Sequence, residues 1–518
     1  MRLLEILVYV TLGAALLGRF VNRSSRPRWV QALAWVALGA VALQVIAEGP
    51  RWQLYPAYAL AVLLAAFSLR SGTGTAKRSW WRTAGRAIVV LASLAVLAVS
   101  ALLAAGMPMF EYPAPSGPHA VGTVRLAMVD RARTDPFAPK AGTPRELLVV
   151  AWYPADVKPG SKPSPFWPAD TSVEAATGLP PFMFSHLERV PAHSYADAPL
   201  SGGGQRLPVV VYSHGYNSSP WQNSVQMEEL ASHGYVVFSI AHTYDSSRVL
   251  FPDGRVVMDN SRTRGKPFTP EQRADWMNRL KEADAERDPE ALRRLWREQK
   301  SMYTFADPSV PVWVADVRFV LDQLAAMDAG DAGDVTGAWQ QFSGRLDLGR
   351  IGVMGQSFGG STAGLVCMQD RRCRAGVNMD GYQFGVKPQA MPVPFMFMAN
   401  DSTNNFAAYD SSAADLYQVR VLRSAHGDFS ALPLIAPLFS WISRPGMALL
   451  GKVDGAEVQR IMNAYLLAFF DRYLLGEPQP LLEATTPQPG LEDAKVTLVP
   501  PGAPFPAAAI ALPATSPP

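Results

Sequence analysis

One stretch of the chain, Arg350–Gly360 with the sequence RIGVMGQSFGG, constrains the fold more than any other. Ile351–Met354 is a short apolar run typical of a buried strand, and the residues after the glycines suit a helix. Between these two elements Gly355, Ser357 and Gly359 form the pattern G-x-S-x-G. A strand, a sharp turn and a helix in this order predict a nucleophile elbow, a strained turn that exposes the serine hydroxyl above the edge of a sheet.

Strand-like and helix-like runs alternate through the part of the chain that contains this elbow. Eight runs are typical of strands: Val124–Val129, Glu146–Trp152, Pro208–Tyr212, Tyr235–Ile240, Ile351–Met354, Ala375–Met379, Pro394–Met398 and Gln418–Leu422. Five helical patterns accompany them: Trp221–Ser232, Val310–Ala326, Ser361–Met368, Phe406–Leu416 and Ala456–Leu475. With the elbow, this alternation predicts an α/β protein with the α/β-hydrolase fold, a mostly parallel eight-stranded sheet with helices on both faces.

Four apolar segments precede that region. They run roughly over Leu3–Leu17, Trp29–Ala47, Leu54–Leu69 and Ala87–Ala105. Each approaches the ~20 residues that a helix needs to cross a bilayer, although the first and third are somewhat short. A signal peptide would explain only the first of them. We therefore predict a membrane domain with four transmembrane helices.

The basic residues predict how these helices are oriented. Arginine and lysine gather in the loops after the first and third segments, whereas the loop between the second and third segments holds only Arg51. Because basic loops face the cytoplasm, both termini are expected outside. We thus expect an integral protein of a bacterial inner membrane, with its catalytic domain on the periplasmic face.

The expected domain organisation follows from these patterns. Residues 1–107 form the membrane domain and 108–122 a linker. The catalytic domain covers 123–484 and carries a charged helical insertion at about 260–304, and 485–518 is a disordered tail rich in proline and alanine.

A net charge of +3 without a basic stripe argues against nucleic acid as a partner.

The two cysteines, Cys367 and Cys373, lack the spacing of a zinc site, and we expect neither a metal nor a cofactor. Both flank the turn between the elbow helix and the next strand. They could form a disulfide if the domain is exported.

A serine nucleophile needs a base, and α/β-hydrolases place serine, acid and histidine in that order along the chain. After Ser357 the sequence contains a single histidine, His426, just past the eighth predicted strand. Two aspartates directly follow strand-like runs and fit the acid almost equally well, Asp380 and Asp401.

The oxyanion hole should use two backbone N–H groups. One belongs to Phe358, directly after the nucleophile, and Tyr216, in the loop after the third strand, is the natural second donor. In the same loop His214 fits a role in bracing the loop better than that of a base.

The region from about Val124 to Leu475 resembles the platelet-activating-factor acetylhydrolase family (plasma, isoform II) of α/β-hydrolases. The resemblance lies in VVVYSHGYNSSPWQNSVQMEELASHGYVVFSIAHTYDSS, GRIGVMGQSFGG, CRAGVNMDGYQF and VLRSAHGDFSALP. It implies Ser357 as nucleophile, Asp380 rather than Asp401 as acid, and His426 as base. It also implies the amides of Tyr216 and Phe358 as oxyanion donors. The activity that it implies is a metal-independent hydrolysis that removes short or oxidised acyl groups from phospholipids. The membrane segments and the charged insertion depart from the family pattern.

The resulting hypothesis is a membrane-anchored serine carboxylic-ester hydrolase that acts on a small-molecule or lipid ester. A dienelactone hydrolase or cutinase-like esterase would use the same triad on another substrate, since a fold does not fix the substrate. A membrane acyltransferase would pass the acyl group to an alcohol instead of water. A third class, a non-catalytic membrane sensor or scaffold, is disfavoured by the intact set of serine, aspartate and histidine.

Overall fold

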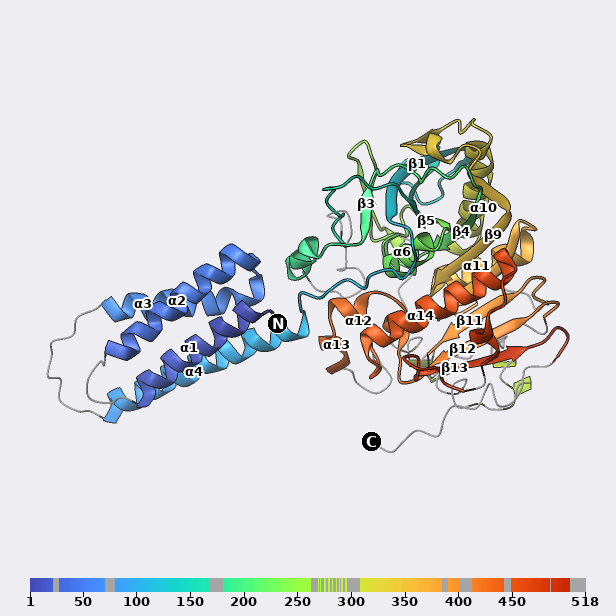
Figure 1. Ribbon diagram of the computed structural model, residues 1–518. Coiled ribbons are helices and arrows are strands. Elements are labelled where there is room, and N and C mark those ends of the chain that lie inside the picture. Colours follow the sequence, from blue (N-terminus) through green and yellow to red (C-terminus); the bar gives the residue numbers. More distant parts are fainter. Residues whose placement is uncertain are drawn as a thin grey trace. The chain divides into compact units, whose positions relative to one another are not determined.

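The computed structural model covers residues 1–518 and describes all of them except 22–27, 70–79, 168–179, most of 262–307, 384–389, 401–411, 442–448, 485 and 504–518. The chain divides into two compact units, which Figure 1 shows coloured along the sequence. Unit 1 contains Met1–Phe110 with two later pieces, Phe182–His186 and Ile435–Ile442. Unit 2 contains the remaining residues.

Unit 1 is built from helices rich in alanine, leucine and valine. They are α1 (Leu3–Val21), α2 (Arg28–Glu48), α3 (Tyr55–Leu69) and α4 (Trp80–Gly106), with a 3-10 turn at Trp52–Leu54. Where the helices pack together, small side chains such as Ala37, Ala57 and Ala61 are fully buried, which lets the backbones approach closely. Larger apolar side chains point outward, as Ile46 (83% exposed) and Ile88 (66% exposed) do.

Among the described residues, three helical stretches are long and apolar enough to cross a membrane: Arg28–Glu48, Trp52–Leu69 and Ala84–Gly106. The segment predicted as the first span, Leu3–Leu17, lies in α1, which is not one of the three. Its first turn carries Glu5, buried against Arg51 with 2.7 Å between Oε1 and Nη1. The sequence thus predicts four spans, and three stretches qualify by length and composition.

Unit 2 is organised around one mixed sheet. Its strands lie in the order β13-β12-β11-β10-β9-β4-β5-β2-β1-β3, and β8 pairs with β1. The bounds are β1 Val121–Thr134, β2 Pro144–Pro154, β3 Ser194–Ala196, β4 Leu207–Ser213, β5 Val236–Ala241, β8 Val335–Thr336, β9 Leu346–Gln356, β10 Cys373–Met379, β11 Phe395–Ala399, β12 Leu416–Val421 and β13 Ala494–Val499. From β5 to β12 neighbouring strands are parallel, while β1, β2, β8 and β13 join by antiparallel pairing.

Eight of these strands lie where the sequence predicts them, and three were not expected. β3 and β8 are only three and two residues long, too short to leave a periodic pattern. β13 falls in the tail predicted to be disordered, yet its run AKVTLV pairs in antiparallel register along β12. Its β-branched residues and its alternation suit an edge strand, so the composition of the tail was misleading there. A separate hairpin joins β6 (Arg248–Leu250) to β7 (Val256–Met258).

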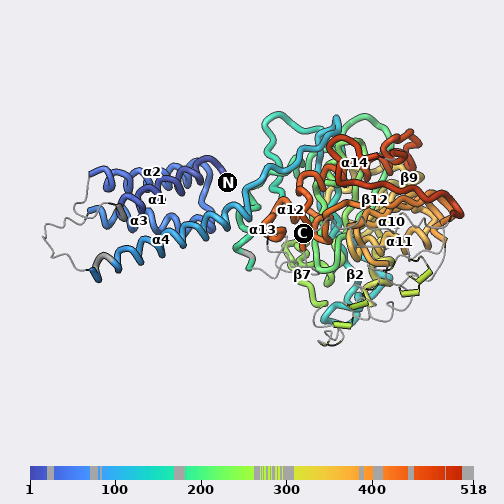
Figure 2. Tube along the Cα trace, turned by 90° about the horizontal axis from the view of Figure 1, so that it is seen from below, coloured from blue at the N-terminus to red at the C-terminus, as the bar shows by residue number. Residues whose placement is uncertain are grey.

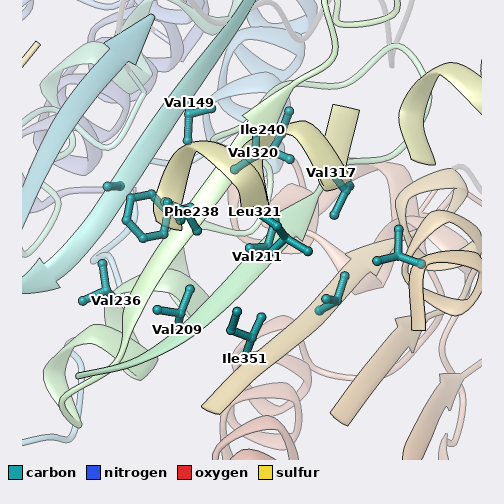
Figure 3. Close-up of a cluster of buried hydrophobic side chains, with 14 of the residues drawn as sticks. Val149, Val209, Val211, Val236, Phe238, Ile240, Val317, Val320, Leu321 and Ile351 are labelled. Atoms are coloured by element: carbon teal, nitrogen blue, oxygen red, sulfur yellow. The ribbon is translucent and has the colours of Figure 1, made fainter. Parts of the chain in front are cut away.

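Helices cover both faces of the sheet because side chains along each strand alternate between them. Val209 and Val211 of β4 pack in a cluster with α10 (Ser309–Asp328) and α11 (Phe358–Gln369). Figure 3 shows Val317, Val320 and Leu321 of α10 against these strands. The intervening residues of β4 face a second cluster with α6 (Ser224–Ser232) and α14 (Gly455–Phe470). Figure 1 labels both helix pairs, and Figure 2 labels α10, α11 and α14 on the Cα trace.

The remaining elements are short. Unit 2 also contains 3-10 turns at Trp339–Phe342, His426–Phe429 and Pro480–Glu483, and a π-helical turn after α14 at Asp471–Leu475. α12 (Leu432–Ile435) begins in unit 2 and ends at the first residue of a later piece of unit 1, which also contains α13 (Leu438–Trp441). The 3-10 turn Pro181–Arg189 begins in unit 2 and continues through the later piece of unit 1. Most of the predicted helical insertion at about 260–304 and of the predicted helix Phe406–Leu416 lies outside the described residues.

Candidate active site

The predicted elbow is present at the end of β9. Ser357 follows the strand directly and has φ 54° and ψ −120°, a conformation that side-chain-bearing residues rarely adopt. The neighbouring glycines are required by close backbone contacts. A Cβ on Gly359 would overlap the carbonyl oxygen of Ser213, and one on Gly355 would overlap the backbone of Gly359. The turn therefore holds the serine between β9 and the first turn of α11.

His426 and Asp380 meet this serine in one chain of hydrogen bonds. The Oγ of Ser357 lies 3.0 Å from Nε2 of His426, and Nδ1 of His426 lies 2.7 Å from Oδ2 of Asp380. The three residues come from the carboxyl ends of β9, β10 and β12, which reach the same edge because these strands are parallel. The structure thus brings together the three residues that the resemblance selects, whereas Asp401 lies outside the described residues.

The carboxylate of Asp380 is held from its other side by Asn400. Backbone N of Asn400 donates to Oδ1 at 3.0 Å, and its Nδ2 donates to Oδ2 at 2.9 Å. The side chain of Asp380 is almost fully buried, and the backbone of this residue has a left-handed φ of 53°. Two donors on a buried carboxylate keep it aligned with the imidazole.

The loop that carries His426 is braced by a second carboxylate. Oδ2 of Asp428 accepts hydrogen bonds from the N–H groups of Ala425 and Gly451, both at 2.7 Å. Burial raises the pKa of Asp428 to about 6, although these two hydrogen bonds oppose the shift. Partial burial disfavours the charged form of His426, but the hydrogen bond and the charge of Asp380 outweigh it and raise the pKa of the imidazole. The His426 side chain remains 47% exposed, so solvent can reach it.

The predicted oxyanion loop lies beside the nucleophile. β4 ends at Ser213, and a Cβ placed on Gly215 would stand 3.3 Å from the Cβ of Ser357. Next along the chain, the ring of Tyr216 packs edge-on against that of Phe358, with 5.3 Å between centroids. The two residues predicted to donate their amides are thus neighbours in space, one in the loop after β4 and the other at the start of α11.

Sequence reasoning missed a buried polar cluster behind this loop. Asp316 of α10 binds Arg145 through both of its oxygens, with Nη2 at 2.6 Å and Nε at 3.1 Å, and contacts Nδ1 of His242 at 2.9 Å. The ring of His242 stacks on Trp313 at 3.7 Å, and Trp313 packs edge-on against Phe358. One signal was available, because Asp316 lies on the apolar face of its helix, between Trp313 and Val320, where an unpaired charge would be costly.

The cysteines are joined. Cys367, near the end of α11, forms a disulfide with Cys373, the first residue of β10, with 5.1 Å between their Cα atoms. The bond closes the connection between the helix behind Ser357 and the strand that leads to Asp380. The pairing hypothesised from the sequence is therefore present in the structure.

Known proteins resemble the part of the chain that carries this site. The family described as platelet-activating factor acetylhydrolase, isoform II, matches residues 110–477. A platelet-activating factor acetylhydrolase of Cavia porcellus is 24% identical over 288 residues, which cover 52% of this chain but only 58% of that protein. A protein of Arthroderma benhamiae named "Probable 1-alkyl-2-acetylglycerophosphocholine esterase" is 23% identical over 426 residues, covering 74% of this chain and 94% of that protein.

A solved structure also resembles most of the chain. The ferulic acid esterase of Streptomyces cinnamoneus aligns with a TM-score of 0.53 and 27% identity, covering 76% of this chain and 99% of that one. The family match starts at residue 110, after α4 has ended at Gly106, so α1 to α4 precede the region that the family shares. That region makes up most of the sequence and includes Ser357, Asp380 and His426, and the chain therefore belongs to the platelet-activating factor acetylhydrolase, isoform II, family.

Proposed function

We propose that this protein is a membrane-bound serine ester hydrolase that removes short or oxidised acyl groups from ester substrates, phospholipids among them. The observation that carries the proposal is the continuous hydrogen-bond chain from Asp380 through His426 to Ser357, with the serine held in a strained elbow. A buried carboxylate, an accessible imidazole and a hydroxyl in this order make up the machinery of acyl transfer.

In the first half of the proposed reaction, Oγ of Ser357 attacks the ester carbonyl carbon while Nε2 of His426 takes the hydroxyl proton. Asp380 accepts a hydrogen bond from Nδ1–H, which fixes the tautomer and stabilises the imidazolium. The N–H groups of Tyr216 and Phe358 stabilise the negative oxygen of the tetrahedral intermediate. His426 then gives the proton to the leaving alcohol, and the acyl group stays on Ser357.

In the second half, water takes the place of the alcohol. His426 removes a proton from the water as its oxygen attacks the acyl carbon, and a second tetrahedral intermediate forms in the same oxyanion hole. Its collapse returns the proton to Ser357 and releases the carboxylic acid. An acceptor alcohol in place of water would make the enzyme a transferase, so the products must be analysed as well as the loss of substrate.

Two features favour a lipid ester as substrate. The relatives include a platelet-activating factor acetylhydrolase and a protein named for 1-alkyl-2-acetylglycerophosphocholine, and unit 1 contains stretches suited to a bilayer. A second candidate is a carboxylic ester without a phospholipid headgroup, because the ferulic acid esterase aligns over 99% of its own length. The cutinase-like and dienelactone hydrolase alternatives belong to this second class.

We further propose that all four helices, α1 to α4, form the membrane domain and that the catalytic domain faces the periplasm. The distribution of basic residues supports this orientation. The disulfide between Cys367 and Cys373 also supports it, because such bonds persist in oxidising compartments.

The test is hydrolysis by the full-length protein purified in detergent. p-Nitrophenyl esters of increasing chain length, a feruloyl ester and a phospholipid with an acetyl group at sn-2 would be compared. Ser357→Ala is expected to abolish turnover without unfolding the protein, and Ser343→Ala, on an exposed turn, serves as the matched control. Turnover that survives in purified Ser357→Ala, or wild-type protein inactive on every ester, would overturn the proposal.

A further inference from the structure

A pair of histidines outside the hydrogen-bond chain of Ser357 lies behind the oxyanion loop. His214 and His242 are both fully buried, with 5.6 Å between their ring centroids. His214 directly precedes Gly215 and Tyr216, so whatever holds its side chain also acts on the backbone of the loop. The hydrogen bonds of this ring indicate what it holds.

The ring nitrogens of His214 have partners that fix its tautomer. Nδ1 lies 2.6 Å from the carbonyl oxygen of Gly215, which can only accept, so Nδ1 carries the proton. Nε2 accepts a hydrogen bond from the backbone N–H of His242 at 3.4 Å, and it lies 2.7 Å from Oγ of Ser246. Nε2 is therefore the unprotonated nitrogen of the ring. Burial and the neighbouring His242 lower the pKa of His214 to about 3, which keeps the ring neutral.

The carbonyl that His214 holds belongs to the same peptide group as the N–H of Tyr216. A trans peptide is planar, and its C=O and N–H point in opposite directions. The oxygen of Gly215 also accepts from the N–H of Ser218 at 3.0 Å, so two donors hold it on one side of the loop. Holding this oxygen fixes the direction of the Tyr216 N–H.

We propose that His214 is a positioning residue of the oxyanion hole, which orients the Tyr216 amide by donating from Nδ1 to the Gly215 carbonyl. The inference rests on the proposed function, in which that amide stabilises the tetrahedral intermediate. It assigns an effect on the transition state to a buried histidine that is not one of Ser357, Asp380 and His426.

The second histidine holds the first in place. His242 donates from Nδ1 to Asp316, so its Nε2, 3.1 Å from Oγ of Ser213, is an acceptor for that hydroxyl. Ser213 is the residue before His214. The Asp316 carboxylate is itself anchored by Arg145, so the backbone N–H of His242 is presented to His214 from a rigid support.

Two substitutions of similar size separate orientation from packing. The amide nitrogen of asparagine can take the place of Nδ1, whereas that of glutamine takes the place of Nε2. His214→Asn should therefore keep the donor to Gly215 and most of kcat. His214→Gln should lose it, and kcat should fall on the order of 100-fold, as when an oxyanion donor is removed, with KM nearly unchanged.

The readouts are kcat and KM per active site titrated with a fluorophosphonate, thermal unfolding, and inhibition by a boronic acid that forms a tetrahedral adduct on Ser357. We expect the Ki of the boronic acid to rise in His214→Gln by about the factor by which kcat/KM falls. Equal kcat in the two variants, or losses that follow their unfolding temperatures, would overturn the inference. Wild-type protein without esterase activity would instead overturn the proposed function.

Ser246→Ala provides a test if neither variant at position 214 folds. It removes the hydroxyl next to Nε2 and weakens the preference for the Nδ1–H tautomer, while the histidine remains. A several-fold lower kcat at unchanged KM and unfolding temperature would support the role of His214, and an unchanged kcat would contradict it.

Discussion

Nδ1 of His426 donates to Oδ2 of Asp380 across 2.7 Å, although the two residues are 46 positions apart in the sequence. Both oxygens of the Asp380 carboxylate accept hydrogen bonds. Oδ1 accepts one from the backbone N–H of Asn400, and Oδ2 accepts a second one from the side chain of Asn400. An amide at position 380 would have only one acceptor oxygen for these three donors.

Asp380→Asn is therefore expected to reduce kcat by about 10⁴-fold, because an NH₂ group facing Nδ1 would favour the wrong imidazole tautomer. The measurement is kcat on a short-chain p-nitrophenyl ester, with folding checked by thermal unfolding. Asp401→Asn is the matched control, since Asp401 is the other aspartate that the sequence allows as the acid, and it should stay near wild type. The reverse ranking of the two variants would assign the acid to Asp401.

The pH dependence should follow the same residue pair. Partial burial lowers the pKa of His426, but the hydrogen bond and charge of Asp380 prevail and raise it above the ordinary 6.5. Only the neutral imidazole can act as a base, so kcat/KM should rise with pH through this raised value. Asp380→Asn removes the charge and should move the acidic limb to lower pH. The same limb in both proteins would mean that another group controls it.

The sequence alone offers one candidate nucleophile and one candidate base, but it leaves two candidates for the acid. Ser357 is marked by its elbow and His426 by being the single histidine after it. Asp380 and Asp401 both follow predicted strands, β10 and β11, which are parallel neighbours whose ends reach the same edge of the sheet. Position along a strand therefore cannot distinguish them, and the prediction of Asp380 as the acid rests on the resemblance to the family.

The parts that sequence reasoning missed are those determined by tertiary contacts. The cluster of Arg145, His242 and Asp316 comes from three distant segments and becomes favourable only when its charges meet. β13 was hidden in a tail rich in proline and alanine, and it is a strand because β12 offers an open edge. The longer strands were predictable because a buried run of apolar residues already excludes most alternatives.

The buried ion pair of this cluster should matter for stability. Arg145 is almost fully buried and bridges Asp316 and Asp135 with contacts of 2.6 and 2.8 Å. Arg145→Met would leave the buried Asp135 without this cation and Asp316 with only Arg133, whose Nη2 lies 3.0 Å from Oδ1. We expect a loss of about 3–5 kcal/mol in the free energy of unfolding. Arg131→Met removes an exposed pair with Asp334, which solvent screens, and should cost much less. Denaturant unfolding would show whether the two losses differ, and equal losses would contradict this account.

Replacing either of two adjacent glutamates of α6, Glu228 and Glu229, by glutamine should change the unfolding temperature at pH 8 in opposite directions. Burial raises the pKa of Glu228 to about 7 in the folded protein, against an ordinary value of 4.5. The folded state then binds this proton more tightly than the unfolded state, so stability falls as pH rises between these values, by roughly 3 kcal/mol in total. Glu228→Gln should remove that loss and raise the unfolding temperature at pH 8 more than at pH 5.

Glu229 is the contrasting control. Burial alone would raise its pKa, but hydrogen bonds with His233 and Ser116 prevail and lower it. Its contribution to stability is present above the unfolded pKa and is lost as pH falls through the folded value. Glu229→Gln should therefore lower the unfolding temperature at pH 8. Parallel changes in the two variants would contradict the assigned charges.

The disulfide provides a test of location as well as of stability. Cys367 and Cys373 are six positions apart, and closing so short a loop is worth about 2 kcal/mol in the chain-entropy account. Replacing both cysteines by serine should lower the free energy of unfolding by about that amount. A periplasmic catalytic domain would carry the bond in the cell, since that compartment is oxidising. Protein trapped with a thiol reagent during lysis should then remain unlabelled until it is reduced. Two thiols labelled without reductant would instead place the catalytic domain in the cytoplasm and reverse the proposed orientation of the membrane helices.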